Sequence, residues 1–114
     1  MAFDMVKPQY TEIEKKPGCI QAALNILGDK WSPLILGLLF EEDKTFGELE
    51  LMLAGISPRT LSSRLDKLEA AKIIRREQYC QHPPRYRYCL TEKGRDLRSI
   101  LVQMGDWGAK YHDN

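Results

Sequence analysis

The chain has 114 residues, 43% of them hydrophobic, which allows one domain with its own core and little more. Its formal net charge is only +1, so total charge does not indicate a polyanionic partner. The longest apolar stretch, residues 34–40, is far shorter than the roughly 20 residues of a membrane span. No secretion signal is visible, and three cysteines are an odd number for a disulfide framework. We therefore expect a cytoplasmic protein without membrane contact.

The charge is distributed unevenly along the chain. Residues 57–98 contain eleven Lys and Arg against five acidic residues, a net of +6. Residues 1–56 contain five Lys against nine acidic residues, a net of −4. The basic half could therefore attract nucleic acid although the whole chain is nearly neutral.

The N-terminal half predicts an arm followed by two helices. We expect residues 1–18 to form the arm, because the Lys-Lys-Pro-Gly sequence at 15–18 interrupts any helix before the domain of residues 19–114. Apolar residues spaced by three and four predict a helix over 19–27, which Gly28 ends. Asp29 can cap a second helix over residues 30–40 with Pro33 in its first turn. This second helix is apolar on almost every side, so we expect it to be the buried centre.

The next two helices are short and lie close together in sequence. Thr45 and Glu48 form a capping-box pattern that predicts a helix over residues 46–53. A tight turn containing Gly55 follows, and Ser57-Pro58 then begins a helix that runs to about residue 72. Two short helices joined by a glycine-containing turn are typical of a helix-turn-helix.

The second of these helices is the predicted DNA-recognition helix. Leu61, Leu65 and Leu68 share one face, which leaves small hydroxyl and basic side chains on the outside. Arg59 and Arg64 could each offer two donors to the edge of a guanine or hold a phosphate, and the sequence leaves both roles open. The expected DNA-binding residues of this helix are Ser57, Pro58, Arg59, Thr60, Ser62, Ser63, Arg64 and Lys67.

A β-hairpin is predicted directly after this helix, in the position of a wing. Residues 73–80 and 86–90 are β-like, and the Pro-Pro loop at 81–85 separates them. We expect His82, Arg85 and Arg87 around this loop to contact the DNA backbone or the minor groove. The alternative is an ordinary solvent-exposed turn.

The chain is predicted to end in one long helix, residues 92–111, capped by Thr91. Its large apolar side chains could fold back on the domain or pack against a second copy, and we favour a two-fold dimer. The expected interface residues are Leu97, Leu101, Met104, Trp107 and Tyr111. Such a dimer would match a palindromic operator in double-stranded DNA.

The sequence gives no catalytic constellation, and we expect no cofactor. Cys80, His82 and Cys89 could in principle bind zinc, but they lack paired CxxC spacing, so we predict no metal site. Cys19 would begin the first helix, where the helix dipole and the nearby Lys15 and Lys16 favour a reactive thiolate. A small, structural helix-starting residue is an equal alternative for Cys19.

Together these motifs resemble the HxlR-type, MarR-related family of winged-helix transcriptional regulators of bacteria. The resemblance covers residues 19 to about 108. It implies an α+β, mainly α fold: a winged helix-turn-helix with a two-stranded hairpin and flanking N- and C-terminal dimerisation helices. The matching segments are Cys19, Leu27–Trp31, Phe46–Leu49, Gly55–Leu65, Pro83–Tyr88 and Leu90–Gly94.

The resemblance also implies a dimeric repressor or activator, in which some members sense electrophiles or oxidants through the cysteine matching Cys19. The family pattern usually has Pro after that cysteine, whereas this chain has Ile20. We therefore predict a homodimeric, sequence-specific DNA-binding regulator, for which a redox or electrophile response through Cys19 and a purely structural Cys19 are both open. The alternative is a winged helix for protein–protein assembly without specific DNA binding. The operator and any small-molecule or oxidant effector are not given by the sequence.

Overall fold

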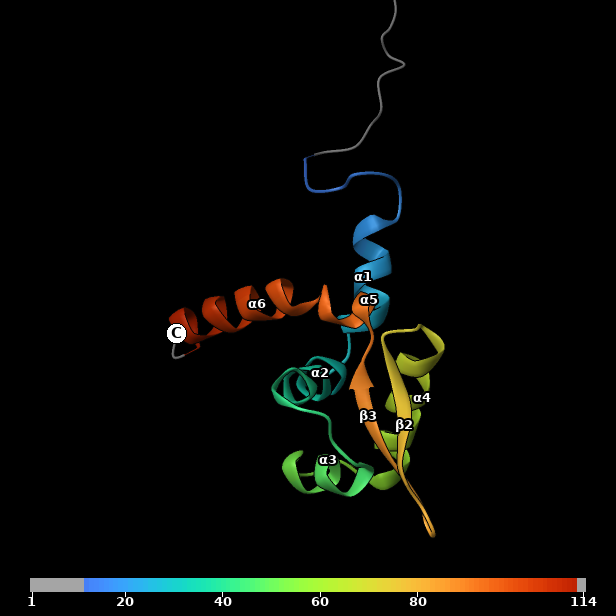
Figure 1. The fold of residues 1–114 in the computed structure, drawn as a ribbon. Helices are drawn as coiled ribbons and strands as arrows, with labels where there is room; N and C mark the ends of the chain where they lie inside the picture. Colours follow the sequence, from blue (N-terminus) through green and yellow to red (C-terminus); the bar gives the residue numbers. More distant parts are fainter. Residues whose placement is uncertain (1–11, 113–114) are drawn as a thin grey trace, which may run out of the picture.

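A computed structural model describes residues 12–112 and shows a mainly helical fold with one β-hairpin (Figure 1). The predicted arm at residues 1–18 lies largely outside the described residues, and its described part contains bends and a turn. No helix among the described residues has both the length and the apolar character that a membrane span requires. The elements are α1 (Cys19–Leu27), α2 (Ser32–Glu41), α3 (Phe46–Met52), α4 (Pro58–Ala70), β2 (Ile74–Gln81), β3 (Pro84–Leu90), α5 (Glu92–Arg95) and α6 (Arg98–Tyr111).

Side-chain caps start α3 and α4, as the sequence predicts. At α3, Thr45 Oγ1 accepts a hydrogen bond from Glu48 N at 3.1 Å, and Glu48 Oε1 accepts one from Thr45 N at 2.8 Å. At α4, Ser57 Oγ accepts from Thr60 N at 3.1 Å. Helix α2 begins at Ser32, two residues later than predicted, and its N-cap residue is Trp31, which makes no side-chain cap. The Asp29 carboxylate, in the turn before α2, accepts the N–H groups of residues 31 and 32.

The core lies where α2, α3, α4 and the base of the hairpin meet. Leu61, Leu65 and Leu68 of α4 are almost completely buried, which confirms the predicted inward face. Helix α2 is less enclosed than predicted, since Leu34 is 50% exposed. The other fully buried apolar residues are Ile35, Leu36, Leu49 and Ile74.

The hairpin extends further toward its tip than the sequence suggested. Strands β2 and β3 are antiparallel, and only His82 and Pro83, joined by a cis peptide bond, lie between them. Arg85 therefore belongs to β3 and not to the loop in which it was predicted. The root of the hairpin is bonded to the loop before α3, where Lys44 and Tyr88 exchange backbone hydrogen bonds of 3.2 and 2.7 Å.

The predicted long C-terminal helix is wrong, because α5 and α6 are separate helices. Thr91 caps α5 as predicted, and its hydroxyl also donates to Lys72 O at 2.6 Å. The backbone then forms a tight turn, in which Leu97 N donates a hydrogen bond to Gly94 O, three residues earlier, at 3.0 Å. This turn brings Leu97 and Leu101 onto the core before α6 continues.

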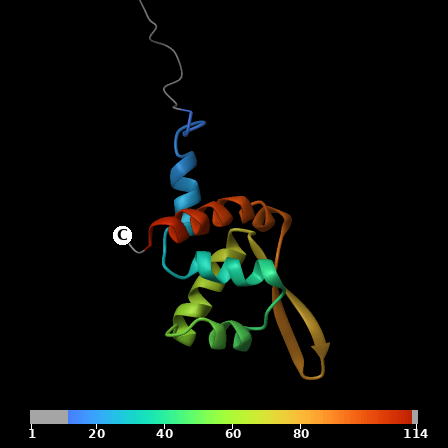
Figure 2. The same ribbon diagram turned by 90° about the vertical axis from the view of Figure 1, so that its left-hand side faces the viewer.

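Helices α1 and α6 project from the body formed by the other elements (Figures 1 and 2). Leu27 is the one buried residue of α1, and α6 contains none. Apolar side chains on both helices therefore face solvent in the single chain, including Leu24 at 52% and Met104 at 48% exposure.

Gly94 is the glycine at which we expect a substitution to be most costly. A Cβ at this position would clash with the backbone carbonyl of Ile73, which cannot move without disturbing β2. We expect Gly94→Ala to lower the free energy of unfolding by about 1–3 kcal/mol. Gly105 in α6 is the control, because a Cβ there meets open space. In urea unfolding, the free energy of unfolding of Gly105→Ala should be unchanged or higher by up to about 1 kcal/mol. Equal stabilities of the two variants would contradict the close packing of Gly94 against Ile73.

Candidate nucleic-acid interface

The N-terminus of α4 and the tip of the hairpin lie at the same end of the molecule, opposite α1, in both ribbon views (Figures 1 and 2). The turn between α3 and α4 depends on Gly55, whose φ of +89° is in the left-handed region that favours glycine. Ile56 N donates to Leu53 O at 3.1 Å and closes this turn. This arrangement is the predicted helix-turn-helix followed by its wing.

Helix α4 presents an exposed face of small and basic side chains at this end. Its buried leucines fix the rotation of the helix, so the opposite side faces solvent. Thr60 is partly buried, and its hydroxyl accepts a hydrogen bond from Ser57 Oγ at 3.0 Å. The predicted DNA-contacting residues that are exposed are Ser57, Pro58, Arg59, Ser62, Ser63 and Lys67.

Arg64 differs from the other basic residues of α4. Its Nε donates to Asp29 Oδ2 at 2.9 Å, and the two side chains are 32% and 20% exposed. Burial raises the pKa of the Asp29 carboxyl, but hydrogen bonds from Ser32, Trp31 and Arg64 outweigh this and lower it below its ordinary value. Sequence patterns could not show this ion pair, because 35 residues separate its partners.

The three predicted wing residues do not lie in equivalent surroundings. His82 and Arg85 are exposed at and beside the tip. Arg87 is only partly exposed: its guanidinium stacks 4.6 Å from the Tyr79 ring centre, and its Nε is buried. Arg87 therefore packs within the hairpin itself, against Tyr79, and does not lie at the exposed tip.

A further arginine, which the sequence analysis did not select, joins the wing to α4. Arg76 Nε lies 3.3 Å from Glu69 Oε2 at the end of α4. The Arg76 guanidinium also lies 5.6 Å from the centre of the Tyr86 ring on β3. Alternation along β2 could have indicated an outward side chain, but not its partner on α4.

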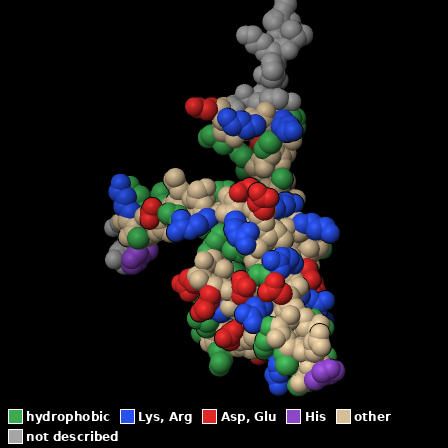
Figure 3. Space-filling model, viewed as in Figure 1, with side chains coloured by type: hydrophobic (Ala, Val, Ile, Leu, Met, Phe, Trp, Pro, Cys, Tyr) green, Lys and Arg blue, Asp and Glu red, His purple; other side chains and the backbone are tan. Residues whose placement is uncertain are grey.

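The predicted dimer residues divide into two groups. Leu97 and Leu101 are only partly buried and pack against the core of their own chain, and their place in a dimer interface stays a prediction. Met104, Trp107 and Tyr111 are 48%, 68% and 42% exposed. Figure 3 shows hydrophobic side chains on both projecting helices.

Apolar residues that the sequence analysis did not assign to an interface extend this surface. Ile20 and Leu24 of α1 face Ile100 and Met104 of α6 across an apolar hollow. Their exposed fractions lie between 41% and 52%. The hollow is also lined by Ile13, Cys19, Ala23 and Leu27. Cys19 is partly buried at the first position of α1, as predicted.

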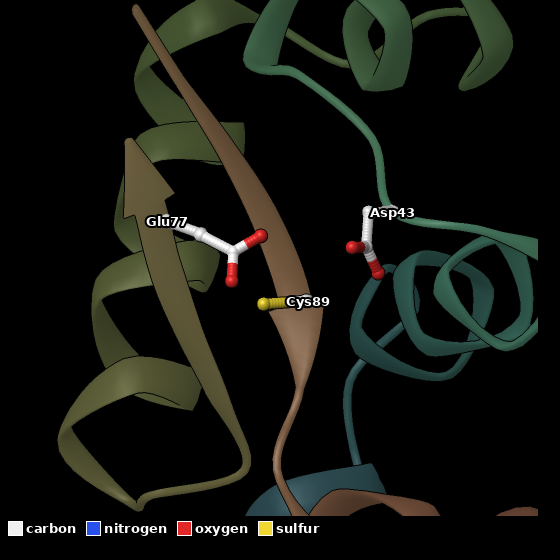
Figure 4. Close-up of side chains that lie close together, drawn as sticks. All are labelled: Asp43, Glu77 and Cys89. Carbon is white, nitrogen blue, oxygen red and sulfur yellow. The ribbon is translucent and has the colours of Figure 1, made fainter. Parts of the chain in front are cut away.

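The weak zinc pattern of the hairpin does not form a cluster. Cys80 pairs with Arg85 near the tip, whereas Cys89 pairs with Arg75 near the root. Cys89 instead lies near two carboxylates, and the ligand atoms of Asp43, Glu77 and Cys89 are all within 4.8 Å of one another (Figure 4).

These three residues lie at the root of the wing, and the contacts of Glu77 and Cys89 there are ordinary polar ones. Glu77 pairs with Arg75 at 3.3 Å, and Cys89 Sγ donates to Arg75 O at 3.6 Å. Burial raises the pKa of the Cys89 thiol, and the charges of Asp43 and Glu77 act in the same direction. The thiol thus stays protonated at neutral pH, and we assign no metal to this group.

Comparison with known proteins identifies the chain at the level of family. The family model of the HxlR-like helix-turn-helix matches residues 26–114. The uncharacterized HTH-type transcriptional regulator YdeP of Bacillus subtilis (strain 168) is 40% identical over 97 residues, which cover 84% of this chain and 76% of YdeP.

Solved structures of similar proteins have the same fold. The redox regulator HypR in its reduced form gives a TM-score of 0.78 at 36% identity, covering 82% of this chain and 93% of HypR. The reduced transcriptional regulator YodB from B. subtilis gives 0.72 at 32% identity, covering 81% and 90%. The chain belongs to the HxlR-like helix-turn-helix family of transcriptional regulators, with a MarR-like winged-helix fold.

Proposed function

We propose that this regulator binds operator DNA as a homodimer, with α4 in the major groove and the hairpin as a wing beside it. One observation carries the proposal: the exposed N-terminal face of α4 and the wing tip lie at one end of a chain of this family. The DNA-binding residues are those predicted for α4, with His82 and Arg85 at the wing and Arg87 supporting it.

The surface of α4 has the chemistry that this role requires. Ser62 and Ser63 are small and exposed, so the helix backbone can approach the base edges closely. Arg59 and Lys67 are exposed cations that can neutralise phosphates. The wing tip adds His82 and Arg85, which can follow the backbone or enter the minor groove.

A second copy of the chain would cover the apolar surface of α1 and α6. Large exposed apolar patches on a small protein usually mark an interface. A two-fold dimer would also place two α4 helices on two half-sites of a palindromic operator. Met104, Trp107 and Tyr111 remain interface residues in this proposal, joined by Ile20, Leu24 and Ile100.

Removing both arginines of α4 tests the DNA-binding proposal. We expect the Arg59→Ala/Arg64→Ala variant to bind a site selected from random DNA at least tenfold more weakly, because each arginine contact is worth about 1–3 kcal/mol. Electrophoretic mobility shift measures this loss. Arg95→Ala/Arg98→Ala is the charge-matched control, since both residues lie outside α4 and the wing. Equal affinity of both double variants would instead favour the protein–protein assembly module.

A charge placed in the apolar hollow tests the proposed dimer. We expect Leu24→Glu to give monomers at micromolar concentration, because a buried carboxylate opposite apolar side chains is strongly disfavoured. Leu51→Glu is the control, because Leu51 is an 86% exposed apolar residue on α3 outside this surface. Sedimentation velocity distinguishes the species. The proposed interface is wrong if Leu24→Glu sediments as the wild type does.

A redox response through Cys19 is a second proposal, supported by the position of this residue. Cys19 lines the hollow between α1 and α6, so a modification of its thiol would disturb the proposed interface. Two of the similar solved structures are named as a redox regulator and as a regulator treated with diamide.

Cys19→Ser tests this response. We expect diamide to change the operator affinity of the wild type several-fold and to leave that of Cys19→Ser unchanged. Cys80→Ser is the control, because Cys80 is also partly buried but lies near the wing tip. Mobility shift before and after dithiothreitol shows whether the change is reversible. The same response in the wild type and in Cys19→Ser would leave Cys19 with a structural role only.

A further inference from the structure

We propose that Asp29 is a positioning residue that directs Arg64 to a guanine base, while Arg59, which has no such partner among the described residues, contacts phosphate. This inference rests on the proposed DNA binding and assigns roles within it. It also brings the turn before α2, which lies outside the helix-turn-helix, into the determination of sequence specificity.

The geometry of the ion pair leaves the two Nη groups of Arg64 available to bind a base. Nε is engaged by Asp29 Oδ2 at 2.9 Å, whereas Asp29 Oδ1 has no hydrogen-bond partner among the described residues. The contact is therefore a single one through Nε. Neither Nη group makes a hydrogen bond within residues 12–112, and neither is buried without a partner, so both remain accessible to solvent. A guanidinium held through Nε still has two parallel Nη–H donors, which match N7 and O6 of guanine.

The net charge around each arginine favours a different role for Arg64 and for Arg59. The carboxylate of Asp29 largely neutralises Arg64, so this pair offers little net attraction to a phosphate, whereas the acceptors on a guanine edge are uncharged. Arg59 is exposed and has no carboxylate partner among the described residues, so its full positive charge is available to the DNA backbone.

The Asp29 carboxylate is itself held in place. It accepts backbone N–H groups of Trp31 and Ser32 at 3.0 Å each, in addition to the Arg64 contact. These bonds fix the carboxylate at the start of α2, which is packed into the core. A fixed partner limits the conformations of the Arg64 side chain before DNA arrives, which reduces the entropy cost of binding.

Asp29→Asn is the informative variant, because the amide oxygen can still accept the two backbone N–H groups while the charge that holds Arg64 is lost. Glu41→Gln is the matched control: it removes one negative charge from an exposed residue at the end of α2, outside α4 and the wing, and leaves Arg64 untouched. Binding is measured by fluorescence anisotropy to a selected site and to versions in which each guanine is replaced in turn.

We expect Arg64→Ala to lose about tenfold or more of the discrimination at one guanine of each half-site. Asp29→Asn should lose discrimination at the same guanine by several-fold, and Glu41→Gln should keep it. Adding Asp29→Asn to Arg64→Ala should change discrimination no further, because Asp29 acts through Arg64. The inference is overturned if Asp29→Asn discriminates as the wild type does, or if it loses specificity evenly at all positions.

Salt dependence tests the assignment of Arg59. Loss of one phosphate contact from each subunit should reduce the slope of log affinity against log salt by about two, since each contributes about 0.9. We expect this for Arg59→Ala and not for Arg64→Ala. Equal slopes for the two variants would overturn the separation of roles.

A measurement without DNA keeps this inference distinct from the proposed function. The ¹⁵N–¹H signal of Arg64 Nε should exchange slowly with water in the wild type and faster in Asp29→Asn, but not in Glu41→Gln. If the wild type selects no DNA sequence, the proposed function fails together with the base-reading role. If it selects a sequence and Arg64→Ala discriminates normally, only the present inference fails.

Discussion

The burial of one leucine face of α4 is the constraint on which the rest of the structure depends. Leu61, Leu65 and Leu68 are held at 1% exposure or less against α2, α3 and the hairpin base. This packing leaves α4 one rotation about its axis, and that rotation decides which side chains face solvent. Burying three leucines stabilises the fold by several kcal/mol at about 1.5–3 kcal/mol per side chain, far more than any single surface contact of α4. The packing of the buried leucine face of α4 therefore determines which side chains lie on its exposed face.

Local chemistry accounts for what could be predicted from the sequence. The caps at Thr45, Ser57 and Thr91 and the turn at Gly55 each depend on residues within a few positions of one another, and all four are present. The family resemblance also rested on such segments and is confirmed by the family model. The exposure of most predicted α4 residues followed from helical periodicity alone.

Contacts between distant segments account for what the sequence could not show. The spacing of apolar residues alone predicts one continuous helix where the structure has α5 and α6. The sequence also does not show that Thr91 and Gly94 lie against the distant carbonyl of Ile73. Leu97 and Leu101 appeared equivalent to Trp107 in that pattern, yet they reach the core and Trp107 does not. In the candidate interface, no short-range sequence pattern could predict that Asp29 is the partner of Arg64.

The attachment of the wing has a consequence for the DNA. Its root is bonded to Lys44, and Arg76 joins it to the end of α4, so the separation between α4 and the wing tip is set within the protein. In the proposed DNA complex, two contacts at a set separation fit grooves of different width unequally. The duplex would have to bend or narrow to meet both, at a cost that depends on its base steps. Bases that touch neither α4 nor the wing would then contribute to operator choice through the stiffness of the DNA between them.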